Sequence, residues 1–162
     1  MGRQVKPVRI DLGDLTDKNV GQLKMLNKTL FPVSYKEPFY KAVLSNPDYL
    51  SQLAFYSGDT LVGAVCCRIE KKDGKVSLYI MTLGVLAVYR GLGIGKKLLE
   101  YVISSVNDKF KNDKVEEIYL HVQEGNDAIK FYTSFGFEEG EKVPDYYINI
   151  EPTSAIILRK KL

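Results

Sequence analysis

The chain has 162 residues, of which 45% are hydrophobic and 27% are charged, a length and balance typical of one globular domain with its own core. Its 23 basic and 20 acidic residues give a net charge of +3, too weak a bias to predict a nucleic-acid-binding protein. No apolar run approaches the ~18 residues of a membrane span, and the N-terminus lacks a signal-peptide core, so we expect a single domain over residues 1–162 with no membrane partner.

The N-terminal third is predicted to be mainly helical. Residues 8–12 form a short possible strand, and apolar residues at helical spacing then predict a helix over residues 20–30. Pro32 ends that helix because it excludes helical angles from the residue before it. A second helix is expected from Glu37, with Pro38 in its first turn.

The middle of the chain is predicted to be an antiparallel meander. The pair Asp73-Gly74 is a strong hairpin signal between two strand-like runs. The strands of the meander are expected over residues 50–56, 61–69 and 76–85.

The adjacent cysteines Cys66 and Cys67 lie in this meander. A disulfide between neighbours is sterically unfavourable, and their spacing differs from that of zinc ligands, so the sequence predicts no metal site. We interpret them as small apolar residues in a reducing compartment, namely the cytoplasm, with the nucleus left open as an additional location.

The C-terminal half alternates helices and strands. Apolar residues at steps of four predict a long helix over residues 94–110. The run 115–122 reads as a strand with Tyr119 and His121 on one face. A shorter helix is expected over residues 126–135, ending at Gly136, and a last strand around residues 155–158.

The most informative stretch is the glycine-rich turn between the meander and the long helix. Glycine lets a ligand approach the main chain, and the unpaired N–H groups of a helix N-terminus attract anions. We interpret this turn as the pyrophosphate site of a coenzyme. The residues expected to bind the coenzyme there are Arg90, Gly91, Leu92, Gly93, Ile94, Gly95 and Lys96.

Two common nucleotide signatures do not fit this turn. A Walker loop requires a glycine five residues before its Gly-Lys pair and Ser or Thr after it, where this chain has Arg90 and Lys97. A Rossmann fingerprint requires a third glycine at the position of Lys96.

The pattern that fits is Arg-x-x-Gly-x-Gly between a strand and a helix. It resembles the GNAT superfamily of acetyl-CoA-dependent N-acetyltransferases, and residues 128–132 with 135–137 (AIKFY and FGF) resemble its second signature. The resemblance implies an α/β (α+β) GNAT fold, with a mostly antiparallel mixed sheet of six to seven strands and about four helices. Segments similar to NatE-type N-terminal acetyltransferases of that superfamily are FPVSY (31–35), GAVCCR (63–68), YIMTLGVL (79–86), IYLHVQ (118–123) and YYINIEP (146–152).

The resemblance implies an activity and its partners. The coenzyme would be acetyl-CoA, and the acceptor would be the α-amino group of the N-terminal methionine of a nascent protein, followed by a hydrophobic or other residue. A larger N-terminal acetyltransferase complex at the ribosome would be a further partner, without direct nucleic-acid binding. Two alternatives stay open: acetylation of lysine side chains or small amines, and a non-catalytic subunit.

The resemblance also implies the catalytic residues. It places Tyr79 and His121 as a base pair acting through an ordered water, and Tyr132 as the acid that protonates the leaving thiolate. Chemistry alone favours His121, because an unperturbed imidazole pKa near ~6.5 suits a base better than a phenol pKa of ~10.

Further contacts follow from the same resemblance. The main chain at Leu83 and Val85 would pair with the pantetheine arm, near Tyr132. The family's arm-contacting asparagine is replaced by Gly125, and whether Asn126 takes over is left open. The methionine pocket would be formed by Phe31, Pro32, Val33, Tyr35, Met81, Tyr146, Tyr147 and Ile148.

Overall fold

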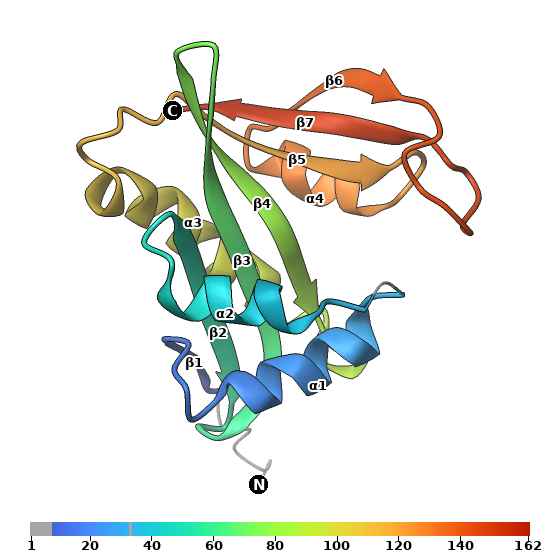
Figure 1. Cartoon of the computed structure of the whole chain (residues 1–162). Coiled ribbons are helices and arrows are strands. Elements are labelled where there is room, and N and C mark those ends of the chain that lie inside the picture. Colours follow the sequence, from blue (N-terminus) through green and yellow to red (C-terminus); the bar gives the residue numbers. More distant parts are fainter. Residues whose placement is uncertain (1–7, 33) are drawn as a thin grey trace, which may run out of the picture. The chain divides into compact units, whose positions relative to one another are not determined.

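The computed structural model describes residues 8–32 and 34–162. Within them, the N-terminal elements are β1 (Ile10–Gly13), α1 (Val20–Leu30), α2 (Glu37–Ser45), β2 (Tyr49–Tyr56), β3 (Thr60–Lys72) and β4 (Lys75–Val85) (Figure 1). The later elements are a 3-10 helix η1 (Ala87–Tyr89), α3 (Ile94–Lys109), β5 (Glu117–Gln123), α4 (Ala128–Ser134), β6 (Glu138–Val143) and β7 (Ala155–Lys161).

The strands form one mixed sheet with the hydrogen-bonding order β1-β2-β3-β4-β5-β7-β6. β5 pairs parallel with β4 and antiparallel with β7, and β1 pairs antiparallel with β2. The predicted mixed sheet of six to seven strands with about four helices is therefore confirmed. None of the helices within the described residues is long and apolar enough to cross a lipid bilayer.

The chain divides into two compact units. The first contains the described residues up to Cys67 together with Met81–Lys109, and the second contains Arg68–Ile80 and Phe110–Leu162. β3 and β4 contribute residues to both units. The prediction of a single domain over residues 1–162 stays a prediction.

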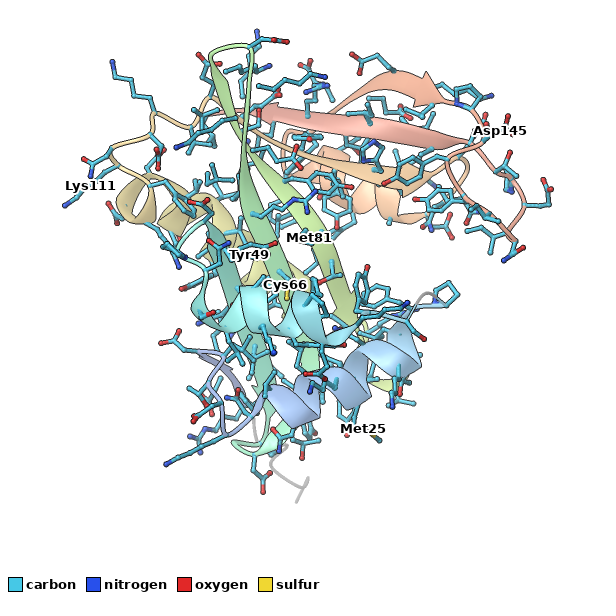
Figure 2. All side chains as sticks on the ribbon, in the orientation of Figure 1. Met25, Tyr49, Cys66, Met81, Lys111 and Asp145 are labelled. Atoms are coloured by element: carbon cyan, nitrogen blue, oxygen red, sulfur yellow. The ribbon has the colours of Figure 1, made fainter. Side chains whose placement is uncertain are left out.

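The first unit has a core between its two N-terminal helices and its strands. Figure 2 shows Met25 on the outer side of α1, where it is 66% exposed, and Cys66 in the interior. Both cysteines are buried and carry no disulfide, as expected, and burial raises the pKa of Cys66 to about 11. The buried cluster comprises Leu23, Leu26, Tyr40, Val43, Leu53, Ala64 and Cys66.

The helix boundaries in this unit follow the proline positions. Phe31, which precedes Pro32, caps the C-terminus of α1 with extended angles (φ −122°, ψ 138°). Pro38 lies in the first turn of α2, where its missing N–H costs no helical hydrogen bond. Both predicted boundaries are confirmed.

The second unit is organised around β5, whose side chains alternate as predicted. Ile118 and Leu120 are buried, whereas Tyr119 and His121 on the other face are partly exposed. A buried carboxylate at the start of the strand, Glu117, is neutralised by ion pairs and a hydrogen bond. Its partners are Arg159 (2.5 Å), Lys75 (3.0 Å) and Ser77 (3.2 Å).

One strand was not predicted. β6 (Glu138–Val143) pairs antiparallel with β7 at the edge of the sheet, and five of its six residues are exposed. Its sequence, EEGEKV, has no apolar alternation because a solvated edge strand buries neither face. Periodicity cannot reveal such a strand.

The end of α4 provides a test of backbone conformation. Gly136 has φ +90°, and an added Cβ would lie 2.8 Å from Lys160 Nζ. Gly136→Ala is expected to lower the free energy of unfolding by about 1–2 kcal/mol, because the left-handed conformation strains any residue with a Cβ. Urea denaturation measures the change.

Gly21→Ala is the matched control. Gly21 lies in α1, and an added Cβ there meets nothing within 4 Å. This variant is expected to be stabilised by up to ~1 kcal/mol. Equal effects of the two substitutions would contradict the assignment of Gly136 as an obligatory helix stop.

Candidate active site

The glycine turn in the first unit has the conformation that an anion cradle requires. Gly91 (φ +83°) and Gly93 (φ +79°) both adopt left-handed angles that favour glycine. An added Cβ at either residue would meet no atom within 4 Å, so the space beside the turn is open. A ligand can therefore approach the main chain here.

The start of α3 supplies the donors. Lys97 N–H donates to Gly93 O (3.0 Å), which closes the first helical turn. The N–H groups of Ile94, Gly95 and Lys96 precede this bond and have no acceptor within the helix. These donors and the positive end of the helix dipole fit a diphosphate.

Arg90 donates two hydrogen bonds to main-chain carbonyl groups that precede it. Its N–H donates to Ala87 O (3.2 Å), and its Nε donates to Val85 O (3.0 Å). The second bond ties the carbonyl at the end of β4 to the turn. The main-chain N–H of Arg90, which was expected to face the pyrophosphate, is thus engaged in η1.

The predicted catalytic pair is formed within the second unit. β4 and β5 are in parallel register with Tyr79 opposite Tyr119, which brings Tyr79 within reach of His121, two residues further along β5. Tyr79 Oη and His121 Nδ1 are hydrogen-bonded at 2.9 Å. The two side chains that the sequence placed 42 residues apart are therefore in direct contact.

Tyr146 completes this group. Its ring stacks on the His121 imidazole, with centroids 4.3 Å apart and planes 8° from parallel. Its hydroxyl lies 3.3 Å from Tyr79 Oη. The sequence analysis assigns Tyr146 to the methionine pocket alone, whereas in the structure it also contacts both Tyr79 and His121.

The surroundings set the protonation of the pair. Burial lowers the pKa of His121 below its usual value, a nearby Glu70 carboxylate opposes this shift, and Arg159 adds to it. Burial, together with the hydrogen bond to Tyr146, raises the pKa of the Tyr79 phenol. At neutral pH the pair therefore consists of a neutral imidazole, which can accept a proton, and a phenol that retains its own.

Two further residues of this unit, Tyr132 and Asn126, are predicted to contact the coenzyme. The Tyr132 ring is buried and packs against Phe131 and Phe137, with centroids 5.1 and 5.5 Å away. Asn126 Oδ1 accepts a hydrogen bond from Ala128 N–H (2.8 Å), which supports the start of α4. The coenzyme contacts of Tyr132 and Asn126 stay predictions.

The first group of predicted pocket residues lies in the first unit. Phe31 and Tyr35 meet edge to face, with centroids 6.2 Å apart. Phe31 also lies against β4, since a Cβ on Gly84 would approach Phe31 Cζ to 3.1 Å. Gly84 thus permits this aromatic group to pack beside Leu83 and Val85. Pro32 and Met81 belong to the same unit, and Val33 lies outside the described residues.

The second group lies on the loop between β6 and β7 in the second unit. Tyr146 and Tyr147 meet edge to face, with centroids 4.9 Å apart. Ile148 is 83% exposed. Tyr147 N–H donates to Thr153 O (2.9 Å), which holds the two sides of the loop together.

Three polar residues near the pair were not predicted as part of a site. Arg68 and Glu70 of β3 are hydrogen-bonded to each other, and Tyr119 of β5 donates to Glu70. The alternation of Arg68 and Glu70 about the buried Ile69 indicates a solvated strand face, so no sequence signal separated these residues from ordinary surface charges.

The sequence matches known acetyltransferases over most of its length. The model of the acetyltransferase (GNAT) family matches residues 21–137. The chain is 50% identical over 155 residues to N-alpha-acetyltransferase 50 of Danio rerio, covering 95% of this chain and 89% of that protein. It is 47% identical over 154 residues to the probable N-acetyltransferase san of Drosophila melanogaster, covering 94% and 81%.

A solved structure shows the same similarity. Arabidopsis thaliana Naa50 in complex with the bisubstrate analogue CoA-Ac-MVNAL is 46% identical to this chain, with a TM-score of 0.79. The match covers 94% of this chain and 99% of that one.

The protonation state of the pair can be measured directly, because the chain contains one histidine. We expect the ring C–H signals of His121 to titrate with a pKa below the ordinary value of ~6.5, since burial disfavours the imidazolium. The folded state then binds this proton less tightly than the unfolded chain, so stability should fall as the pH drops below ~6.5. A pKa at or above that value in NMR would contradict the assignment.

Proposed function

Because the chain belongs to the GNAT acetyltransferase family, and within it to the group of N-alpha-acetyltransferase 50 and San, we propose that it transfers acetyl from acetyl-CoA to the α-amino group of N-terminal methionine in nascent proteins. The Arabidopsis relative supports both substrates, since its analogue joins CoA to a peptide that begins with methionine. The observation that carries the proposal is the bond between Tyr79 and the neutral His121.

The strength of this base suits an α-amine. An N-terminal amine has a pKa near ~8, so a useful fraction is already neutral at pH 7 and a weak base suffices. A lysine side chain, with a pKa near ~10.4, needs a stronger one. The lowered pKa of His121 therefore favours N-terminal acceptors over lysine.

The geometry supports a relay for the proton. Tyr79 Oη takes up the proton that leaves the amine, directly or through one water, while its own hydrogen passes to His121 Nδ1 across the 2.9 Å bond. Tyr79 remains a phenol throughout, in keeping with its raised pKa, and His121 carries the charge at the end. Such general base catalysis contributes on the order of 10²- to 10⁴-fold.

The remaining residues hold the substrates. Acetyl-CoA supplies the acetyl group as a thioester. The N–H groups of residues 94–96 would bind its diphosphate, the main chain at Leu83 and Val85 would pair with the pantetheine arm, and Tyr132 would give a proton to the departing thiolate. Phe31 and Tyr35 of the first unit, and separately Tyr146 and Tyr147 of the second, each offer an aromatic surface that would suit a flexible apolar first residue such as methionine. Discrimination among similar apolar side chains should be only ~1–3 kcal/mol.

We also propose that the protein acts in the cytoplasm as the catalytic subunit of a NatE-type complex at the ribosome. This proposal is supported by the 50% sequence identity to N-alpha-acetyltransferase 50 of Danio rerio and by the segments that resemble NatE-type enzymes. Co-purification of the tagged chain with ribosomes and a larger acetyltransferase subunit tests this. Recovery of the chain from the cytoplasm in uncomplexed form alone would argue against it.

The substrate proposal is tested by CoA release with synthetic peptides. We expect turnover with a Met-Leu peptide and little with the same peptide already acetylated, because the acceptor nitrogen is then an amide. Peptides with an acidic first residue should react poorly. Equal rates for Met-Leu and acidic-start peptides, or turnover confined to lysine side chains, would contradict the proposal.

The relay makes a prediction about two single variants. His121→Ala and Tyr79→Phe should each lower kcat by about 10²-fold, since either change breaks the proton path. Acetyl-CoA affinity, measured by calorimetry, should be nearly unchanged in both. Retention of most activity in Tyr79→Phe would show that His121 accepts the proton without Tyr79, and a large loss of acetyl-CoA affinity would make His121 structural.

A further inference from the structure

A carboxylate beside the catalytic pair joins two residues that touch Tyr79. Glu70 Oε1 accepts hydrogen bonds from Arg68 Nε (3.2 Å) and Nη2 (3.0 Å), and Glu70 Oε2 accepts one from Tyr119 Oη. The side chains of Arg68 and Glu70 are only 40% and 30% exposed, so this ion pair is partly shielded from water. Both oxygens of one carboxylate are thus used to fix neighbouring side chains.

Both of these neighbours lie against the Tyr79 ring. The Tyr119 ring is tilted 42° to it, with centroids 4.8 Å apart. The Arg68 guanidinium carbon lies 5.7 Å from the Tyr79 centroid, in a cation–π arrangement. Glu70 therefore restrains the Tyr79 ring through two separate contacts.

We propose that Glu70, Arg68 and Tyr119 form a positioning cluster that holds the Tyr79 ring so that its hydroxyl stays on His121 Nδ1. The functional consequence rests on the proposed function, because this position affects turnover only if the pair moves a proton. The three residues act through Tyr79 and take no proton themselves. A merely structural network would stabilise the sheet without altering the bond between Tyr79 and His121.

The charges around the cluster are consistent with this role. Burial and the bond to Glu70 raise the pKa of Tyr119, so Tyr119 remains a donor that can anchor its ring. Arg159 of β7 lies over the Tyr119 ring at 5.2 Å, and Tyr146 covers His121 from the loop after β6. Burial lowers the pKa of His121, the Glu70 carboxylate opposes this shift, and Arg159 adds to it.

Tyr119→Phe tests the cluster with little change in shape. The substitution keeps the ring against Tyr79 and removes the hydroxyl that anchors it to Glu70. We expect kcat for a Met-Leu peptide to fall about 10-fold, because a catalytic group displaced by about 1 Å can lower the rate by up to ~10²-fold. The KM for acetyl-CoA should stay unchanged. Glu139→Gln is the control for replacing a carboxylate by an amide. Glu139 is exposed on β6, and this variant should retain wild-type kinetics.

A double-mutant cycle separates positioning from simple destabilisation. If Tyr119 acts through Tyr79, then Tyr119→Phe should cost almost nothing further when Tyr79 is already Phe. Losses that multiply in the double variant would overturn the proposal.

A second readout does not depend on activity. The ¹⁵N signal of His121 Nδ1 reports its hydrogen bond, and the Tyr79→Phe variant provides the reference for its loss. We expect Tyr119→Phe and Glu70→Gln to move this signal toward the reference. Glu70→Gln should also lower the pKa of His121, because the negative charge of Glu70 raises that pKa in the wild type. Unchanged signals in both variants would contradict the cluster. If the wild type does not acetylate Met-Leu peptides, the proposed function is wrong. The ¹⁵N comparison still shows whether the cluster positions Tyr79 on His121.

Discussion

The hydrogen bond between Tyr79 Oη and His121 Nδ1 is the interaction on which the proposed chemistry depends. It exists because β4 and β5 pair in parallel with Tyr79 opposite Tyr119, so that the next outward residue of β5 faces the phenol. The parallel register of β4 and β5 therefore determines which side chains meet here. The contact between Tyr79 and His121 is thus a product of sheet topology.

Partial burial of this pair lowers the pKa of His121 and raises the pKa of Tyr79. It destabilises the imidazolium and the phenolate alike, so His121 is neutral and Tyr79 keeps its proton. The pair is consequently a weak base. Weak bases are adequate for N-terminal amines and poor for lysine, so the environment of His121 is consistent with the proposed N-terminal acceptor.

The sequence predicted the parts of the fold that depend on periodicity or on special residues. The alternation in β5, the proline-defined ends of α1 and α2, and the helix stop at Gly136 follow from local sterics and burial. The edge strand β6 could not be predicted because it buries neither face. The bond from Tyr119 to Glu70 depends on how β3, β4 and β5 are placed side by side, which no local pattern encodes. The bond between Arg68 and Glu70 is local to β3, but in the sequence this pair looks like ordinary surface charges.

A crystal structure with CoA linked to a methionine-led peptide would test the account most directly. We expect the diphosphate on the N–H groups of residues 94–96, and the methionine nitrogen within ~3.2 Å of Tyr79 Oη or one water away from it. A diphosphate bound elsewhere, or a methionine nitrogen beside a different titratable side chain, would contradict the account.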